Sequence, residues 1–435
     1  MTVVTREVDQ RSLVARRHGP RGGGGRLRVG FVLEGMLLGG CPINAIDLAR
    51  TLRERGHHLV LIAIDDDVPV SVLPYAEAAG FEVERIPPGS RLLARARHLR
   101  SLARVHDLDV LHVFATSLAS SAVLACGWNV HRIPVALNWL MENEFRTTSR
   151  TPLIVGTRGM HREALQRHGT RSYLLEPPVD VERDRPDAGA RLAFRERHGI
   201  AETDLALVLV GRIDALGEQL QAQTDHRYAD KLPGIMLALD AVLERRDRRL
   251  RLVLVGDGSG MAAVRRRVDE VNEGLGWDAV VLTGALEDPH PAYAAADIGL
   301  AMGGSALRVM AHGVPLVVLG TRGFSRLLTP ETADYFLEHG YFGTEAPGRP
   351  VRHFLDHLDR LEHARERARL GAWGLNLVRD QYGLGTAAER LEELYSETFA
   401  HTDSRWERLQ DIAFAGGRDA AGRLRRELSS VWGTT

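Results

Sequence analysis

The sequence contains two successive series of short apolar runs, and each run is followed by an amphipathic or loop stretch. Alternation of buried strands with helical stretches is typical of α/β proteins with parallel sheets. The predicted strands of the first series are residues 27–33, 58–64, 109–114, 135–137 and 153–155, and those of the second series are residues 205–210, 250–255, 279–282, 298–301 and 315–319. We therefore expect an α/β protein with two Rossmann-like, doubly wound domains in tandem.

Proline and charge patterns set the expected domain boundaries. The stretch at residues 177–187 is rich in proline and charge and predicts a linker between the two series. We expect a flexible Arg/Gly-rich arm over residues 1–26, a first domain over residues 27–183 and a second over residues 184–380. Residues 381–435 are expected to form C-terminal helices whose first part packs back on the first domain. Two facing sheets of this kind would hold a ligand in a central cleft, beyond the carboxyl ends of their strands.

The composition argues against several classes of function. A chain of 435 residues with 44% hydrophobic and 26% charged residues can build full-sized globular cores. The formal net charge of −1 favours neither nucleic acid nor an anionic membrane as a partner. No apolar run has the length of a membrane span, and the arm at residues 1–26 lacks the apolar core of a secretion signal. Two cysteines fit a reducing cytoplasm, and the arginine, alanine and glycine content suggests a GC-rich genome such as that of an actinomycete. The oligomeric state stays open, a homodimer included.

Lys231 is the only lysine among 56 basic residues. Lysine is a compact point charge and arginine a planar fork, so an arginine-rich sequence would keep a lysine where a buried diphosphate requires it. The alternative is a surface residue without function. Arg212 could supply a second cation. Gly303-Gly304-Ser305 could supply backbone N–H groups if it opens a helix, because a helix N-terminus attracts phosphate. Ser305 would then be a helix cap or a phosphate ligand.

Glycines in the loops after predicted strands are further candidates. Gly39 and Gly40 would let the backbone of the first domain approach a sugar or phosphate, although loop glycines are equally common as plain turn residues. Gly256 stands in a Gly-Asp-Gly segment that suits a tight turn as well as a ligand contact. Gly284 follows the next predicted strand.

The order of these motifs resembles the donor-binding half of the retaining GT-B glycosyltransferases of family 4. Each motif is weak alone, but their joint order is specific. They are, in chain order, Gly211-Arg212, Asp230-Lys231-Leu232-Pro233-Gly234, Gly256-Asp257-Gly258, Thr283-Gly284 and the stretch from Met302 to Pro315. Gly39-Gly40 and Val179-Asp180 are similar to the first loop and the inter-domain turn of that family, and residues 381–399 are similar to its closing helices. The resemblance implies a GT-B fold and transfer of sugar from a GDP- or UDP-sugar, with retention of configuration and without a metal.

The resemblance also implies roles for the candidate residues. Arg212 and Lys231 would stabilise the leaving diphosphate, and Glu34 is the candidate base. The donor-binding set would be Gly39, Gly40, Arg212, Lys231, Gly256, Gly284, Gly303, Gly304, Ser305, Ala306, Leu307 and Arg308. The acceptor would be a small molecule with a hydroxyl or thiol group, and its binding set would be Glu34, His112, Asn138 and Glu142. Structural alternatives remain for these residues: Glu34 as a capping or ion-paired carboxylate, His112 as a core histidine and Glu142 as a solvated residue.

The sequence departs from the family at three places. Leu300 and Arg308 stand where two glutamates are usual, and an arginine cannot accept hydrogen bonds from ribose hydroxyls. We therefore expect Arg308 either to change how the nucleotide is held or to turn outward. The loop at residues 138–144 lacks the usual histidine. Residues 215–229 form a polar insert, which a solvated loop explains better than a lid.

These departures keep other interpretations open. The stretch at residues 302–308 is similar to antibiotic-pathway transferases of actinomycetes, lincosamide thioglycosyltransferases among them, which suggests a role in specialised metabolism. One alternative is a non-catalytic GT-B protein that binds a sugar nucleotide or a partner. Another is a GT-B isomerase that acts on a sugar nucleotide. The sequence shows no metal-ligand cluster and no nucleophile motif, and we expect no cofactor besides the sugar-nucleotide substrate.

Overall fold

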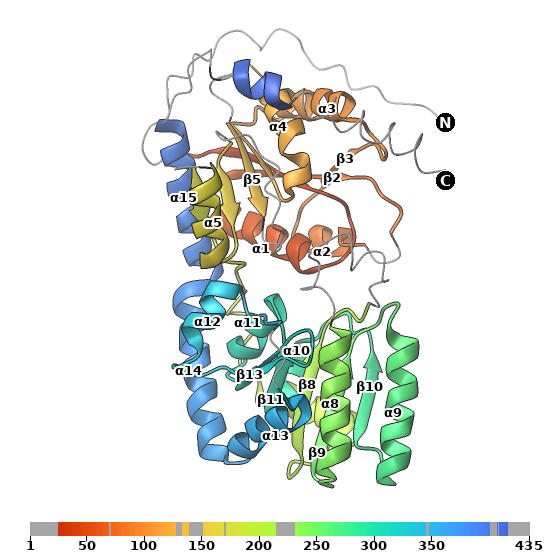
Figure 1. Ribbon diagram of the computed structural model, residues 1–435. Coiled ribbons are helices and arrows are strands. Elements are labelled where there is room, and N and C mark those ends of the chain that lie inside the picture. Colours follow the sequence, from red (N-terminus) through yellow and green to blue (C-terminus); the bar gives the residue numbers. More distant parts are fainter. Residues whose placement is uncertain are drawn as a thin grey trace, which may run out of the picture.

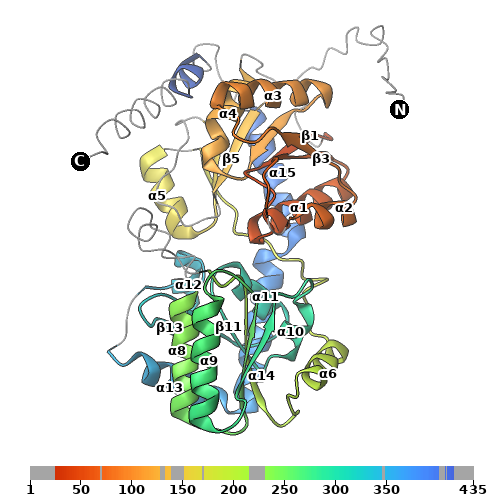
Figure 2. The ribbon, with the colours of Figure 1, turned by 90° about the vertical axis from the view of Figure 1, so that its right-hand side faces the viewer.

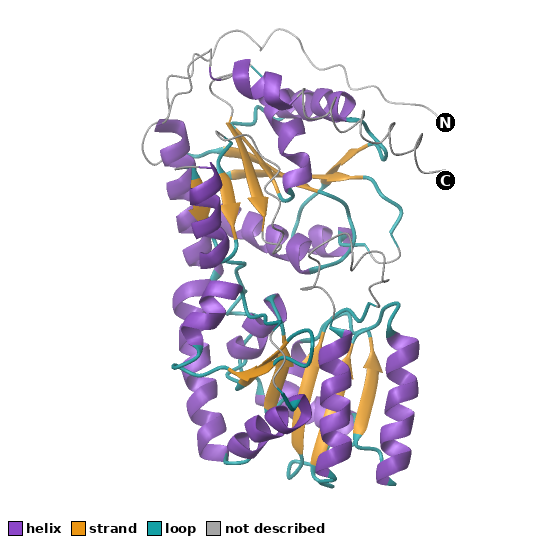
Figure 3. Cartoon of the chain, viewed as in Figure 1, coloured by secondary structure: helices purple, strands orange, loops and turns teal. Residues whose placement is uncertain are grey.

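The computed structural model consists of two α/β units stacked end to end (Figure 1). It describes residues 25–68, 71–127, 133–138, 151–168, 171–214, 231–344, 348–400, 407 and 409–415. Each unit has one sheet, and strands alternate with helices along the chain, so the expected α/β class is confirmed (Figure 3). In the described part of the chain, no helix combines the length and apolarity that crossing a membrane requires.

The first unit is built on seven parallel strands in the order β3-β2-β1-β4-β5-β6-β7. The strands are β1 (Arg28–Leu33), β2 (His58–Ile64), β3 (Val83–Ile86), β4 (Val110–Val113), β5 (Ile133–Asn138), β6 (Leu153–Val155) and β7 (Ser172–Leu174). The helices are α1 (Gly40–Glu54), α2 (Leu73–Ala78), α3 (Leu92–Val105), the short 3-10 helix η1 (Thr116–Leu118), α4 (Ala119–Cys126) and α5 (Arg158–His168). The direction of strand order reverses between β1 and β4, which defines a topological switch point.

The second unit has six strands in the order β10-β9-β8-β11-β12-β13, and only β13 runs antiparallel to its neighbour. The strands are β8 (Leu205–Val210), β9 (Leu250–Val255), β10 (Val280–Gly284), β11 (Ile298–Ala301), β12 (Leu316–Leu319) and β13 (Ser325–Leu327). The helices are α6 (Ala188–Arg197), α8 (Leu232–Arg245), α9 (Met261–Leu275), α10 (His290–Ala295), α11 (Gly304–Ala311), α12 (Ala333–His339) and α13 (Pro350–Leu361). Its switch point lies between β8 and β11.

Burial explains which strands the sequence predicts. The central strands β1, β4, β8 and β11 are almost wholly buried and read as continuous apolar runs, because helices cover both faces of the sheet. The strands missed in the sequence are β3, β7 and β13, whose sequences are VERI, SYL and SRL. Each of them is an edge strand, so polar residues are tolerated there and no apolar run marks the strand.

The chain passes between the two units twice, at neighbouring positions. The first crossing is the linker between β7 and α6, and the second joins α14 (Ala364–Tyr382) to α15 (Leu384–Ala400). The N–H of Val179 donates to the carbonyl oxygen of Tyr382 at 2.8 Å, and Val179 also forms a bridge with Gly383. Helix α14 packs on α11 of the second unit, and α15 packs on α1 of the first (Figure 2). The two crossings therefore form a short, paired hinge.

Candidate active site

The candidate groups of the second unit gather beyond the carboxyl ends of four neighbouring strands. Arg212 follows β8, Gly256 follows β9, Gly284 ends β10 and Gly303 follows β11. Because these strands are parallel neighbours, their ends lie along one edge of the sheet. This edge includes the switch point between β8 and β11, where ligands of doubly wound sheets bind.

Lys231 is held close to the loop that follows β8. It precedes the first residue of α8, where Pro233 in the first turn suits the start of a helix. A Cβ atom added to Gly211 would lie 1.9 Å from Nζ of Lys231, so the absence of a side chain at Gly211 makes room for the ammonium group. Within the part of the chain that the structure describes, Lys231 forms no ion pair.

The electrostatics of Lys231 suit an anionic ligand. Burial and the nearby guanidinium of Arg212 lower the pKa of Lys231 to about 8, and Asp214 opposes this shift. Arg212 is more than half exposed and pairs with Asp214 through its Nε atom. A buried cation beside a second cation gains more from a bound anion than an exposed one, because the anion offsets both burial and repulsion. The pair Arg212 and Lys231 therefore concentrates positive charge at this edge of the sheet.

The glycines after β8 and β9 are needed for packing. A Cβ at Gly256 would lie 1.9 Å from the carbonyl oxygen of Gly211, and one at Gly258 would lie 2.4 Å from that of Ile213. The N–H of Gly211 donates to the carbonyl of Val255 at 2.9 Å. Gly256 thus lets two loop backbones touch, which favours its turn interpretation. At Gly284, where φ is +75°, a Cβ would meet no atom within 4 Å, so backbone conformation and not crowding calls for glycine.

Helix α11 begins as the sequence predicts, but its cap differs. Gly303 is the N-cap, with φ at +58°, and its N–H donates to the carbonyl of Tyr341 at 2.9 Å. Ser305 lies inside the helix, and its hydroxyl donates to the carbonyl of Met302 at 2.9 Å. The expectation that Ser305 caps the helix is wrong, because Gly303 occupies that position. Among the described residues, the N–H groups of Gly304 and Ser305, in the first turn, have no recorded partner and could donate to an anion.

The side chains further along α11 face away from such an anion. Ala306 and Leu307 are buried, so only their backbone could contact a donor. Arg308 is neither turned outward nor aimed at the helix N-terminus. Its Nε lies 3.7 Å from Oδ2 of Asp184, a buried linker residue, and 19% of its side chain is exposed. Leu300 is fully buried in β11. The role predicted for Arg308 in holding the nucleotide stays a prediction.

In the first unit, Glu34 lies at the matching switch point. It follows β1, and its Oε1 accepts a hydrogen bond of 2.5 Å from the hydroxyl of Ser117, which follows β4. The sequence analysis missed Ser117, although its place after a predicted strand could have indicated it. Gly39 is the N-cap of α1 with an extended backbone, and a Cβ at Gly40 would meet nothing within 4 Å. Glu34 is exposed at this edge and free to face a ligand.

His112 does not belong to the acceptor side. It is fully buried in β4, its ring stacks on Phe114, and its Nδ1 lies 2.6 Å from the hydroxyl of Tyr395 in α15. Burial lowers the pKa of His112 to about 3, so the ring is neutral. The acceptor role expected of His112 is therefore wrong, and the alternative of a core histidine holds.

Several expected site residues lie outside what the structure describes. The backbone of Asn138 ends β5, but its side chain is not described. Glu142 and the polar insert at residues 215–229 also lie outside the described residues. Their assignments stay predictions.

One group of potential ligands for a metal ion escaped the sequence analysis. Asp184, His290 and His312 place one ligand atom each within 4.8 Å of the others. They come from the linker, the start of α10 and the end of α11. No spacing in the sequence links them, because three separate segments bring them together.

Comparisons with known proteins were made for the sequence and for the fold. Residues 226–361 match the sequence profile of the family described as Glycosyl transferases group 1. A "GDP-mannose-dependent alpha-(1-6)-phosphatidylinositol monomannoside mannosyltransferase" of Mycobacterium tuberculosis is 27% identical over 356 residues, covering 73% of this chain and 84% of that protein.

Two solved structures share the fold. HepE of Anabaena, in complex with UDP, has a TM-score of 0.63 at 15% identity and covers 85% of this chain and 100% of its own. A glycosyltransferase from Rickettsia africae has a TM-score of 0.66 at 14% identity and covers 86% of this chain and 99% of its own. The likeness extends over both units.

Proposed function

We propose that this chain, a glycosyltransferase with a GT-B fold, transfers a sugar from a GDP- or UDP-sugar to a hydroxyl or thiol group of a small molecule. The observation that carries the proposal is the pair of cations beyond β8: Lys231, seated against Gly211, and Arg212 beside it. Two free N–H groups at the start of α11 complete an anion site across the switch point.

The proposed reaction breaks the bond between the anomeric carbon of the sugar and the diphosphate oxygen. Negative charge grows on the leaving diphosphate, and Arg212 and Lys231 stabilise it where it develops. The acceptor oxygen or sulfur bonds to the anomeric carbon, and its proton passes to a base, for which Glu34 is the candidate. Retention of configuration is part of the proposal and rests on the resemblance of the motifs to family 4.

The choice of donor is supported by what is similar to this chain. The mycobacterial relative is GDP-mannose-dependent, and HepE is known in complex with UDP. GDP-mannose and UDP both contain a nucleoside diphosphate. The proposed site would bind the diphosphate group that the two have in common. A guanine or uracil preference would be set by residues other than the two cations.

The acceptor is proposed to meet the first unit at the end of β1. Glu34 and Ser117 offer a carboxylate and a hydroxyl there. The relative acts on phosphatidylinositol monomannoside, a lipid-linked acceptor; for this chain we propose a small molecule of specialised, antibiotic-type metabolism. Product analysis with both acceptor types distinguishes the two.

Calorimetric titration with GDP and UDP tests the donor site. Lys231→Ala should weaken binding of the preferred nucleotide by about 2–4 kcal/mol, the cost of losing a desolvated charge-assisted contact. Lys231→Arg should also be impaired, because the planar guanidinium is larger than the ammonium that fits against Gly211. Arg266→Ala removes an exposed cation of α9 and serves as the control. Unchanged affinity in Lys231→Ala would remove Lys231 from the site.

Turnover completes the test. Release of nucleoside diphosphate from the sugar nucleotide should depend on acceptor, and Glu34→Gln should lower turnover while nucleotide affinity stays nearly unchanged. Binding without any release, over a panel of acceptors, would favour the non-catalytic alternative. Conversion of the sugar nucleotide without acceptor would favour an isomerase.

A further inference from the structure

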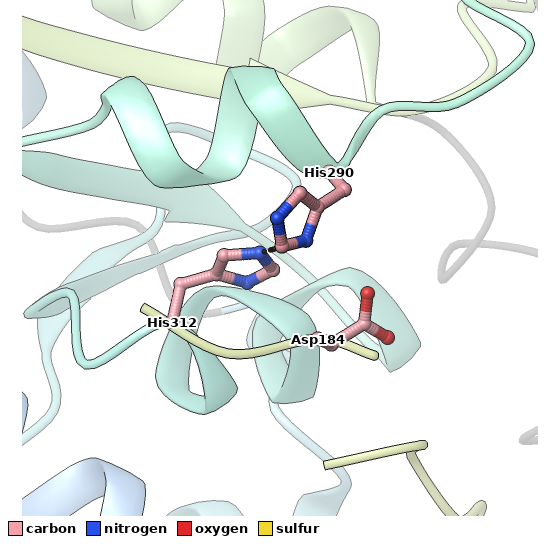
Figure 4. A group of neighbouring side chains, drawn as sticks. All are labelled: Asp184, His290 and His312. Atoms are coloured by element: carbon pink, nitrogen blue, oxygen red, sulfur yellow. Dashed lines mark hydrogen bonds between the residues drawn. The ribbon is translucent and has the colours of Figure 1, made fainter. Parts of the chain in front are cut away.

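The side chains of Asp184, His290 and His312 converge where the linker meets the second unit (Figure 4). Asp184 and His312 are buried and His290 is partly exposed. Nε2 of His312 lies 3.0 Å from Nδ1 of His290. The ring of His312 also stacks on Tyr293, with ring centroids 5.4 Å apart, so its orientation is fixed by packing.

The outer ring nitrogens already have acceptors. Nδ1 of His312 lies 2.8 Å from the carbonyl oxygen of Arg308, which can only accept, so this nitrogen carries the proton. Nε2 of His290 faces the carboxylate of Asp187 at 3.5 Å and is placed to donate to it. Histidines that bind metals usually donate their second N–H to a carbonyl or carboxylate in this way.

The two inner ring nitrogens face each other, with Nδ1 of His290 lying 3.0 Å from Nε2 of His312. Because Nδ1 of His312 carries the proton of that ring, its Nε2 presents a lone pair. Nδ1 of His290 either donates a proton to this lone pair or, when the proton of His290 is on Nε2 beside Asp187, presents a second lone pair. In the second tautomer both lone pairs are available to one metal ion.

The carboxylate of Asp184 supplies the third ligand. Arg183 and Arg308 both approach Oδ2 of Asp184, at 3.3 and 3.7 Å. One oxygen of this carboxylate lies within 4.8 Å of a ring nitrogen of each histidine.

We propose that Asp184, His290 and His312 form a binding site for a divalent transition-metal ion, with Zn²⁺ as the best fit. Two imidazole nitrogens and one carboxylate oxygen match the ligands of zinc, whereas Mg²⁺ and Ca²⁺ prefer oxygen ligands throughout. Zinc with three protein ligands takes a water as the fourth. A bound ion would tie the linker to α10 and α11. This proposal does not depend on the donor, the acceptor or the reaction.

The test is calorimetric titration of the full chain, freed of metal with a chelator, with Zn²⁺ and separately with Mg²⁺. We expect one Zn²⁺ per chain and no binding of Mg²⁺. His290→Gln should weaken Zn²⁺ binding at least as much as the roughly 10–100-fold that loss of an outer partner costs. Cobalt(II) should give the absorption of a tetrahedral site in the parent and not in His290→Gln.

His363→Gln is the matched control, because His363 is an exposed histidine at the start of α14. It should bind Zn²⁺ like the parent. His290 is partly exposed, so His290→Gln should fold, and its circular dichroism and unfolding without metal should match those of the parent. The proposal is overturned if the parent binds no Zn²⁺ at a one-to-one ratio, since the contact of the two histidines would then be a hydrogen bond alone. Equal affinity in the parent and in His290→Gln would overturn it as well.

Discussion

A single side chain, that of Lys231, carries most of the functional interpretation. The structure adds a reason for a lysine that composition alone could not supply. The ammonium group of Lys231 occupies space that any side chain at position 211 would fill, so it requires the glycine there. Burial and the neighbouring guanidinium of Arg212 depress its pKa to about 8. An unfolded lysine titrates near 10.4. Because the pKa of Lys231 is lower in the folded than in the unfolded protein, the charged form of Lys231 destabilises the fold. This loss of stability becomes smaller as the pH rises above about 8 and the lysine of the folded protein loses its proton.

A pH dependence of nucleotide binding follows at this scale. Above about pH 8 the free protein loses the proton of Lys231, so affinity for a nucleoside diphosphate should fall, by up to about tenfold per pH unit. Binding near that pH should take up a proton, because the anion favours the charged lysine. Calorimetry between about pH 7.5 and 9.5, in two buffers of different ionisation enthalpy, measures both effects. In Lys231→Arg the charge persists, and the residual affinity should stay flat. Equal slopes for parent and variant would contradict the assignment.

At the scale of the elements, α14 approaches the end of α11 closely at a pair of glycines. Gly371 of α14 is buried, and a Cβ there would lie 2.0 Å from the carbonyl oxygen of Gly313, just after α11. Helix α14 thereby holds the end of α11, the helix whose first turn belongs to the proposed anion site. The contact couples the C-terminal helices to the candidate donor site.

Gly371→Ala should destabilise the protein by about 1–3 kcal/mol, because the backbone of α14 must move away from α11. Gly385→Ala provides the comparison in α15, since a Cβ there would meet nothing within 4 Å. This second change should be neutral or stabilise by less than about 1 kcal/mol, as alanine favours helix over glycine. Thermal and urea unfolding of both variants decide between the two cases. A Gly371→Ala variant as stable as the parent would show that the two helices have room to separate.

At the scale of the whole molecule, a polar network joins the first unit to the linker. The guanidinium of Arg183 lies 3.4 Å from Asp47 of α1 and also donates to the hydroxyl of Tyr75 of α2. Arg50 of α1 pairs with Asp180 at 2.8 Å. Asp47 is buried, and burial raises the pKa of its carboxyl. The linker is therefore held to the first unit by ion pairs, one of which includes the buried carboxylate of Asp47.

Arg183→Leu should cost about 1–3 kcal/mol, because Asp47 keeps a buried carboxylate without its cation. Amide hydrogen exchange should rise in α1, α2 and the linker and stay unchanged in the sheet of the second unit. Arg185→Leu, an exposed arginine two residues on, is the control and should leave both measurements unchanged. If exchange in the linker is the same in both variants, the network does not hold the linker to the first unit.

The sequence by itself determined the α/β class and the positions of the central strands. Strands buried on both faces must be apolar along their whole length, so the central strands could be located from short apolar runs. Arg212 became a candidate because it follows such a strand, and Lys231 because it is the only lysine of the sequence; their role in binding stays a prediction. The start of α11 at Gly304 was likewise predictable from glycines after a strand.

Only the tertiary structure decided the roles that depend on neighbours distant in the sequence. His112 is a core residue because α15 returns to cover it with Tyr395. Arg308 turns to Asp184 because the linker passes beside α11. The edge strands β3, β7 and β13 escaped prediction because an edge position tolerates polar residues, whereas the edge strand β10 keeps an apolar run and was predicted. Periodicity and spacing predict contacts within one segment of the sequence. The contacts of His112 and Arg308 form between distant segments. The order of strands within each sheet and the path of the linker decide which of these segments meet.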